Sequence, residues 1–341
     1  MRSGCYYYIS LSFYFIKSLI YFFHRCGKER SSLIRILIQD KLFMLGFLFI
    51  SILLLLSLLN SIINDGSIRQ VPILFDKNGN VIGTPPFAPS LRFPLGTDRN
   101  GYDMLHMMIQ GAKFTIGIAL LIMMLRMALA IMIGGTLGVY CKKWIPKLEN
   151  FFDSFTVVPL TLIAYFILVN VLWMPSDGFP HPFWKRAVFE VFVLTVLALP
   201  TLSFYIANDI RRVYREEFVQ AAKILGGSKW HIFKVHVLPH VLENWVLLSI
   251  QQFIQVLMVL AHLGVLQLFF GGTYVDYMQI DPPKTTSYEW SGLIGDSYQV
   301  ISITPWIPLI PIVFFSLTII SSQFILNGLK RAFILKRRVK N

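Results

Sequence analysis

The sequence has few charged residues for its length. Asp, Glu, Lys and Arg account for 14% of the 341 residues, and hydrophobic residues account for 55%. Soluble domains devote about a quarter of their residues to these four charged types. The formal charge is +13, but a nucleic-acid-binding protein carries its basic residues on a polar chain. The composition therefore excludes an ordinary soluble domain and a nucleic-acid partner, and it predicts a membrane protein.

Cysteines and catalytic patterns are also scarce. The three cysteines, Cys5, Cys26 and Cys141, show no metal-ligand spacing. In the topology derived below they fall on the inner side or at its boundary, where the cytosol is reducing, so no disulfide is expected. No nucleophile, base and oxyanion donors stand at a convincing spacing. We expect no redox chemistry, no metal or cofactor bound by this chain, and no catalytic activity of its own.

Long apolar stretches dominate the chain. A helix needs about 20 mostly apolar residues to cross the hydrocarbon core, because the core is about 30 Å thick. Six stretches meet that length, at residues 42–63, 115–140, 155–173, 188–206, 241–266 and 306–326. A seventh, residues 6–23, is interrupted by Lys17 and rich in Tyr and Phe. We expect it to lie along the inner headgroups as an interfacial helix, with a seventh span as the alternative.

The distribution of basic residues predicts the orientation. With six spans and an inner N-terminus, 22 of the 31 Lys and Arg residues fall on inner segments, eight fall on outer loops, and Arg126 lies within a span. Cytoplasmic loops carry an excess of Lys and Arg. The sequence therefore predicts an all-α polytopic membrane protein with both termini inside.

The spans separate segments of different character. Residues 1–41 and the tail 327–341 are basic and are predicted to lie inside. Residues 64–114 and 267–305, the outer segments, are rich in Pro, Gly and Asp and are expected to form ordered caps. The inner loop, residues 207–240, is unusually long for a connection between spans of a polytopic protein. We therefore expect the inner loop to carry function.

The inner loop shows the pattern of two amphipathic helices. Apolar residues recur at three- and four-residue spacing over 209–225, which predicts the first helix. Gly226 is suited to end it, because glycine readily adopts the left-handed conformation of a helix C-terminus. Ser228 can cap a second helix over 229–237, and Pro239 fits the start of the next span. Such a loop suits docking to a cytosolic partner; the alternative is that it lies along the headgroups.

Two groups of residues resemble the oligopeptide/dipeptide group of ABC importer permeases. The inner loop resembles that family's EAA loop through Glu216, Glu217, Gln220, Ala221, Ala222, Gly226, Leu238 and Pro239. The first outer segment is similar to the outer-loop signature of the C-type subunit through Leu95, Gly96, Thr97, Asp98, Gly101 and Asp103. Two positions depart from the family pattern: Gln220 stands where Glu is usual, and Tyr102 stands where Arg is common.

The resemblance implies the fold and the partners. It implies a type I ABC importer permease with six transmembrane helices in the bacterial inner membrane, forming half of a translocation pathway. The other implied partners are a second homologous permease, two ATPases that hold ATP and Mg²⁺, an extracytoplasmic substrate-binding protein and membrane lipid. This chain lacks the GxxxxGK[ST] pattern of a P-loop, so ATP hydrolysis would come from another subunit. Peptides are the implied substrate, with nickel or another metal chelate or small solute as the alternative.

Several residues carry competing interpretations. Trp230, Ile232 and Phe233 are expected to be the apolar anchors of the inner loop on the ATPase, since aromatic side chains dominate such interfaces. Arg126, near mid-bilayer, either lines the pathway or bonds backbone carbonyls or the partner permease. Asp98 and Asp103 are expected to accept N–H bonds within their own turn, in preference to binding a metal.

Two other classes of protein compete with the importer. A membrane enzyme would gather titratable residues at one depth of the spans, and only Arg126 lies there. A secondary transporter or channel would more naturally show internal repeats or several intramembrane charges. A transporter or channel would also not need a long amphipathic inner loop, so the importer permease is favoured. A metal or proton role for His231, His236 and His240 is not favoured, because they fall in the inner loop.

Overall fold

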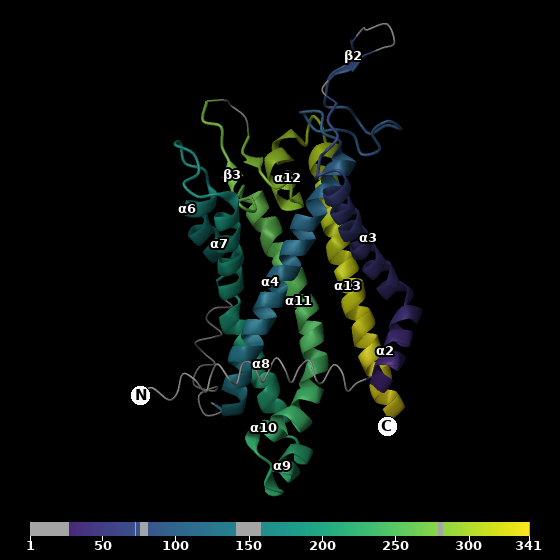
Figure 1. Cartoon of the computed structure of the whole chain (residues 1–341), viewed down its shortest axis with the longest axis vertical. Coiled ribbons are helices and arrows are strands. Elements are labelled where there is room, and N and C mark those ends of the chain that lie inside the picture. Colours follow the sequence, from purple (N-terminus) through teal and green to yellow (C-terminus); the bar gives the residue numbers. More distant parts are fainter. Residues whose placement is uncertain (1–26, 72, 76–80, 141–157, 279–281, 341) are drawn as a thin grey trace.

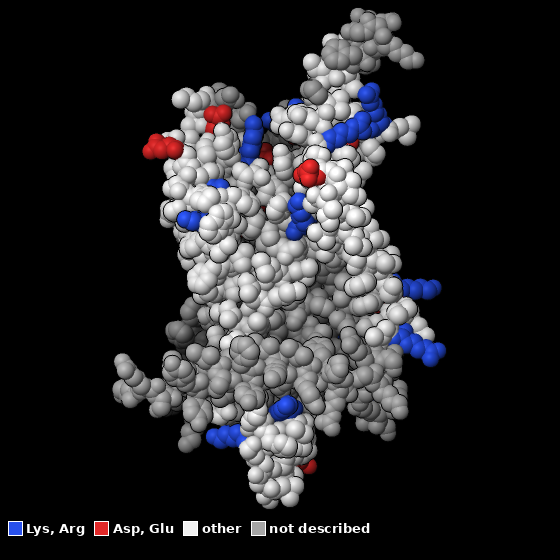
Figure 2. Space-filling model, in the orientation of Figure 1, with Lys and Arg blue, Asp and Glu red and all other residues white. Residues whose placement is uncertain are grey.

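The computed structural model describes residues 27–71, 73–75, 81–140, 158–278 and 282–340. The prediction for residues 6–23 lies outside these ranges, as do the three cysteines. Long helices run side by side along the molecule, with α12 and the outer segments at one end and α9 and α10 at the other (Figure 1). Figure 2 shows charged side chains at the outer end, at the inner end and on one flank, with mostly white side chains on the described face between them.

Four helices are long and apolar enough to cross a membrane. They lie at Lys41–Ile63, Met104–Tyr140, Lys229–Val265 and Trp306–Arg337, and the pair Phe183–Val196 and Leu199–Val213, bent by 41°, makes a fifth if it is one span. These five contain or nearly coincide with five of the six predicted stretches. The sixth, 155–173, contains only the shorter helix α6 (Leu160–Leu172), and residues 155–157 lie outside the described ranges. The described chain is thus an α-helical membrane protein with four to five candidate spans.

The helices extend well beyond the predicted spans. Helix α3 (Lys41–Ile63) follows α2 (Gly27–Gln39), and Asp40 caps it by accepting the N–H groups of Leu42 and Phe43. Helix α4 (Met104–Tyr140) begins eleven residues earlier than the predicted span at 115, so the first outer segment ends at Asp103. Hydrocarbon thickness sets a minimum length for a spanning helix and no maximum.

The predicted basic tail is part of a helix. Helix α13 runs without interruption over Trp306–Lys340, so residues 327–340 continue the last span. Arg331 pairs with Asp40 at 2.6 Å, and Arg337 pairs with Glu243 at 2.9 Å. These ion pairs connect the inner end of α13 to the start of α3 and to α11 (Leu238–Val265). The basic segment predicted to follow the last span is therefore helical as far as Lys340.

The predicted span 188–206 and the predicted inner helix 209–225 are both divided. Helix α7 (Phe183–Val196) is followed by α8 (Leu199–Val213), which has Pro200 in its first turn. Helix α9 (Glu217–Ile224) starts only after a break at 214–216. Helix α8 therefore continues the span into the inner loop, and the boundary expected at residue 207 lies in mid-helix.

The second inner helix is continuous with the next span. Helix α10 (Lys229–Ile232) passes through a π-helical stretch, η1 (Phe233–Val237), directly into α11. Ser228 caps α10 by accepting the N–H of His231 at 3.2 Å, as predicted. The run from Lys229 to Val265 is therefore one rod that reaches from the inner loop through the bundle.

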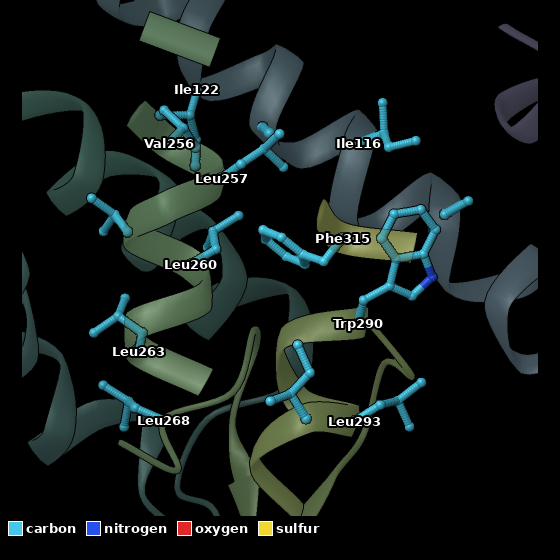
Figure 3. Packing of buried hydrophobic residues seen from close by; sticks show 14 of the residues in the cluster. Ile116, Ile122, Val256, Leu257, Leu260, Leu263, Leu268, Trp290, Leu293 and Phe315 are labelled. Atoms are coloured by element: carbon cyan, nitrogen blue, oxygen red, sulfur yellow. The ribbon is translucent and has the colours of Figure 1, made fainter. Parts of the chain in front are cut away.

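The outer half of the bundle holds the larger hydrophobic core. Trp290, at the start of α12 (Trp290–Ser297), is fully buried, and its indole N–H donates to the Met108 carbonyl of α4 at 2.9 Å. Figure 3 shows Trp290 and Phe315 near Ile116 of α4, with Leu257 and Leu260 on α11. Helices α4, α11, α12 and α13 are joined at this core.

Two short hairpins complete the outer segments. Strands β1 (Leu74–Phe75) and β2 (Val81–Gly83) pair antiparallel, as do β3 (Thr273–Tyr274) and β4 (Lys284–Thr285). A single 3-10 turn, η2 (Tyr298–Val300), leads toward α13. Tyr102 of the first outer segment packs edge-on against Tyr288 of the second, with ring centroids 6.2 Å apart. The two segments therefore contact each other, and we call them together the outer cap.

Candidate functional site

The corner between α8 and α9 is held by side chains of the inner loop. The Tyr214 carbonyl accepts a hydrogen bond from Nε2 of Gln220 at 2.7 Å and another from Nζ of Lys223 at 3.2 Å. A glutamate at position 220 has no N–H to donate. The amide of Gln220 thus stabilises the corner from within the chain.

The expected apolar anchors are largely buried. Ile232 and Phe233 are 2% and 1% exposed, and they pack with Ile210 of α8 and Trp245 of α11 in a second hydrophobic core. Trp230 is half-buried and stacks on Phe233 with ring centroids 5.7 Å apart. The prediction that Ile232 and Phe233 face a partner is therefore wrong, because these side chains of α10 and η1 pack against their own chain.

A different pair of apolar side chains is exposed. Ile224 and Leu225, at the end of α9, are 86% and 87% exposed, and Phe218 is 40% exposed. Gly226 follows with a φ of +84°, as expected for the residue that ends the helix. Ile224, Leu225 and Gly226, hereafter the inner tip, lie between α9 and α10, at the inner end of the molecule (Figure 1).

The remaining motif residues of the inner loop lie along α9 and at the start of α11. Glu216, Glu217, Gln220 and Ala221 are exposed, and Ala222 is half-buried. Leu238 is buried at the start of α11, and Pro239 occupies its first turn, where a missing N–H is tolerated. The structure thus separates the motif into an exposed part on α9 and a packing part at the start of α11.

One buried acid fixes the two helices that flank the inner loop. Asp209 of α8 accepts hydrogen bonds from Arg212 at 3.1 Å and from the Asn244 amide of α11 at 3.3 Å. This residue was not predicted to belong to the site. An acid followed three residues later by arginine, at the inner end of an apolar helix, is the signal that was present.

Arg126 is fully buried inside the bundle. Its Nε and Nη2 donate to the Leu194 carbonyl at 2.9 and 2.6 Å, and its Nη1 donates to Gln252 and Gln255 of α11 at 3.3 and 3.5 Å. Of the alternatives for Arg126, the structure shows the bond to a backbone carbonyl. The side chain does not itself reach the surface of this chain, so it is not a pathway-lining cation within it.

The break between α7 and α8 explains why this carbonyl needs a donor. In a continuous helix the Ala198 N–H would donate to Leu194, but here it donates to Thr195 at 3.3 Å. Within a bilayer no water can satisfy the freed carbonyl. The guanidinium therefore satisfies a carbonyl that the bend leaves without its helical partner. The glutamines 252 and 255 were not singled out, although amides in the middle of an apolar span are themselves a signal.

The outer-loop signature residues build the cap. Oδ1 of Asp98 accepts the N–H groups of Asn100 and Tyr102 at 3.0 and 2.7 Å, which closes a turn. Oδ1 of Asp103 accepts the N–H of Leu105 at 2.9 Å and so caps α4. These contacts are the turn bonds that were expected. In the described ranges, no three His, Cys, Asp or Glu residues are grouped as metal ligands would be.

The other signature residues have similar structural roles. The carbonyl of Thr97 accepts the indole N–H of Trp306 at 3.2 Å, and its hydroxyl accepts the N–H of Phe87 at 2.9 Å. Gly96 and Gly101 have φ values of +74° and +81°. Leu95 packs against the larger core. The signature therefore attaches the first outer segment to the outer end of α13.

Burial in this cap raises the pKa of the Asp98 carboxyl. Desolvation raises the pKa of Asp98 from 3.8 to about 6, although hydrogen bonds from backbone N–H groups oppose the shift. An acid whose pKa is higher in the folded state binds more protons folded than unfolded between these two values, so stability falls as the pH rises from about 4 to about 6.

We expect Asp98→Asn to stabilise the cap at neutral pH. The Asn side-chain oxygen can accept the same two N–H bonds without an ionised group to desolvate. The thermal unfolding midpoint of the variant should exceed that of the wild type at pH 8, and the difference should shrink toward zero at pH 4.5. If the difference in unfolding midpoint does not change with pH, ionisation of Asp98 does not affect the stability of the protein.

Known transport proteins are similar to this chain in sequence. The chain is 27% identical over 265 residues to the peptide transport system permease protein SapC of Haemophilus influenzae, covering 75% of this chain and 80% of the relative. It is 24% identical over 298 residues to the dipeptide transport system permease protein DppC of Alkalihalophilus pseudofirmus, covering 86% of each. It is 21% identical over 258 residues to the oligopeptide transport system permease protein OppC of H. influenzae, covering 75% and 74%.

The fold and these sites define a polytopic membrane component with an ordered outer cap and a projecting inner loop. Residues 128–338 match the family described as binding-protein-dependent transport system inner membrane component, and the chain belongs to this family. It is therefore a non-catalytic ABC permease subunit of the inner membrane that functions within a transport system dependent on a binding protein.

Proposed function

We propose that the chain is one of two homologous permeases in an ATP-driven importer of peptides. Support comes from three relatives whose names specify peptide, dipeptide or oligopeptide transport, each matched over about three quarters or more of both chains. Two ATPase subunits holding ATP and Mg²⁺ would power the importer, and an extracytoplasmic binding protein would deliver the peptide to the outer cap.

The inner tip is the proposed contact with the ATPase. Its exposed Ile224 and Leu225 offer an apolar surface, and the exposed acids Glu216 and Glu217 lie at the opposite end of α9. The tip projects beyond the inner ends of α4 and α13, which favours a protein groove over the lipid headgroups as its binding site (Figure 1). This projection is the observation that carries the proposal.

Two structural features support the proposal that a displacement of the inner tip moves the membrane-spanning helices. The run from α10 through η1 to α11 has no break, so a displacement at the inner loop would move α11 as a rigid body. Asp209 ties α8 to α11 through Asn244, so the two helices that flank the loop would move together. We further propose six spans with both termini inside, in which the segment containing α6 forms the third.

Purification and uptake together test the function. A tagged chain isolated in mild detergent should bring a second permease and ATPase subunits with it. A strain lacking the gene should lose ATP-dependent uptake of labelled di- or pentapeptides and regain it on complementation. Unchanged peptide uptake in the deletion strain, with loss of nickel-chelate uptake, would replace the peptide proposal; transport by the isolated chain alone would refute the importer class.

A further inference from the structure

One membrane-spanning helix has an exposed face that is polar in its middle. From residue 241 to the outer end of α11 the exposed positions are Gln251, Gln255, Met258, His262 and Val265, and we call this set the α11 stripe. Their spacing of four and three residues places them on one side of the helix. The stripe therefore runs along α11 from the depth of Arg126 toward the outer end.

Two other spans, α3 and α4, expose a different chemistry. Between residues 42 and 63, α3 exposes only Leu, Ile and Phe side chains, including Ile52 at 50% and Leu55 at 58%. The mid-span exposed positions of α4 are also apolar, among them Leu121 and Met124. Such faces suit lipid. Amides in hydrocarbon are costly without a partner, and intramembrane polar groups usually face a protein interior or a water-filled cavity.

The side chains of the stripe also argue against close packing on another helix. Helix pairs in membranes approach through small residues such as Gly, Ala and Ser. The α11 stripe carries long side chains instead, with Gln, Met and His at four of its five positions. A water-filled pathway accommodates both the polarity and the length of these groups.

Arg126 determines how Gln255 presents its amide. The guanidinium has donors and no acceptor, so the Gln255 oxygen must point toward Nη1, 3.5 Å away. The amide nitrogen is then directed away from Arg126, on a side chain that is exposed. Gln255 therefore offers N–H donors, and no formal charge, on the exposed face at mid-span depth.

We propose that the α11 stripe lines the translocation pathway and that Gln251 and Gln255 hydrogen-bond backbone carbonyls of a peptide in transit. The inference rests on the proposed peptide import and adds the residues that contact the substrate. Neutral amides match the group that every peptide shares, whatever its side chains. Arg126 acts through Gln255 as a positioning residue and does not contact the substrate.

Cysteine labelling of the assembled importer tests whether the stripe is in water. The natural Cys5, Cys26 and Cys141 are replaced with serine, and single cysteines are introduced as Gln251→Cys, Gln255→Cys and Met258→Cys, with Ile52→Cys and Leu55→Cys as controls on α3. A membrane-impermeant methanethiosulfonate should label the stripe at least about tenfold faster than the controls, because the reactive thiolate forms in water and not in lipid. Trialanine should slow labelling during turnover.

Kinetics test the contact itself. Gln251→Leu and Gln255→Leu should each raise the KM for trialanine by about three- to tenfold, the effect of losing one neutral hydrogen bond. Gln323→Leu makes the same change at an exposed position of α13 and should leave KM unchanged. Met258→Cys provides a labelling site that disturbs no amide.

The outcomes separate this inference from the proposed function. Stripe cysteines that label no faster than the α3 controls, or only after the second permease is removed, would overturn the inference even if the wild type imports trialanine. Rapid labelling with unchanged KM in both Gln→Leu variants would overturn the substrate contact. A wild-type complex that does not import trialanine would instead reject peptide import, and the labelling rates would still report whether the stripe is in water.

Discussion

Replacing Arg126 with leucine should lower peptide import by at least about tenfold while the chain still inserts. Leucine cannot donate to the Leu194 carbonyl, which the bend between α7 and α8 leaves without its helical N–H. An unsatisfied buried carbonyl costs about 1–3 kcal/mol, and each 1.4 kcal/mol corresponds to a tenfold change in an equilibrium. Insertion should not suffer, because a central arginine itself costs about 2.5–3.5 kcal/mol to insert.

The measurement compares membrane abundance with initial uptake rates over a range of peptide concentrations. Arg126→Lys keeps a cation and one donor group but lacks the planar fork that reaches both Leu194 and the two glutamines, so it should retain an intermediate rate. Arg126→Leu should also raise the KM, because it releases the oxygen of Gln255. Full uptake with an unchanged KM in the leucine variant would refute both the structural and the positioning role.

Replacing Gly226 with aspartate should abolish coupling of ATP hydrolysis to import. Gly226 has a φ of +84°, and a Cβ built on it would meet nothing within 4 Å, so the chain has room for the side chain. The left-handed conformation costs an L-residue about 1–2 kcal/mol, which is too little to unfold the bundle. The new carboxylate would lie at the inner tip, where the ATPase groove is proposed to close, and would prevent seating.

Two variants separate the backbone effect from the side-chain effect at the tip. Gly226→Ala has a similar φ cost without charge or bulk and should retain most import. Gly178 also has a positive φ, +88°, with nothing within 4 Å of its Cβ, but it lies in the loop between α6 and α7. Gly178→Asp should therefore leave import and ATPase activity unchanged. Normal import in Gly226→Asp, at equal abundance, would reject docking by the inner tip.

Local sequence patterns predicted several features correctly. Ser228 caps α10 and Gly226 ends the preceding helical segment, because both depend on residues only a few positions away. The acceptor role of Asp98 and Asp103 is local in the same sense. The permease family was identifiable from the inner-loop and outer-loop motifs, and the family match over residues 128–338 confirms it.

Other features depended on residues distant in the sequence. Ile232 and Phe233 have the pattern of exposed anchors, but α8 and α11 cover them, so the exposed tip consists of Ile224 and Leu225 instead. The break at 214–216 is stabilised by Gln220 and Lys223 through the Tyr214 carbonyl, which the helical periodicity of 209–225 does not reveal. Periodicity locates an apolar face and does not identify what covers it.

The amino-acid sequence by itself determined the membrane class and the apolar stretches, because both follow from composition and the length of each run. It also placed a cation, Arg126, in the middle of a span. Only the tertiary structure decided what that cation binds. The bend after Val196 frees the Leu194 carbonyl, and packing brings α4, α7 and α11 together around it. Because hydrocarbon supplies no alternative partner, this packing determines both the acceptor of Arg126 and the orientation of Gln255.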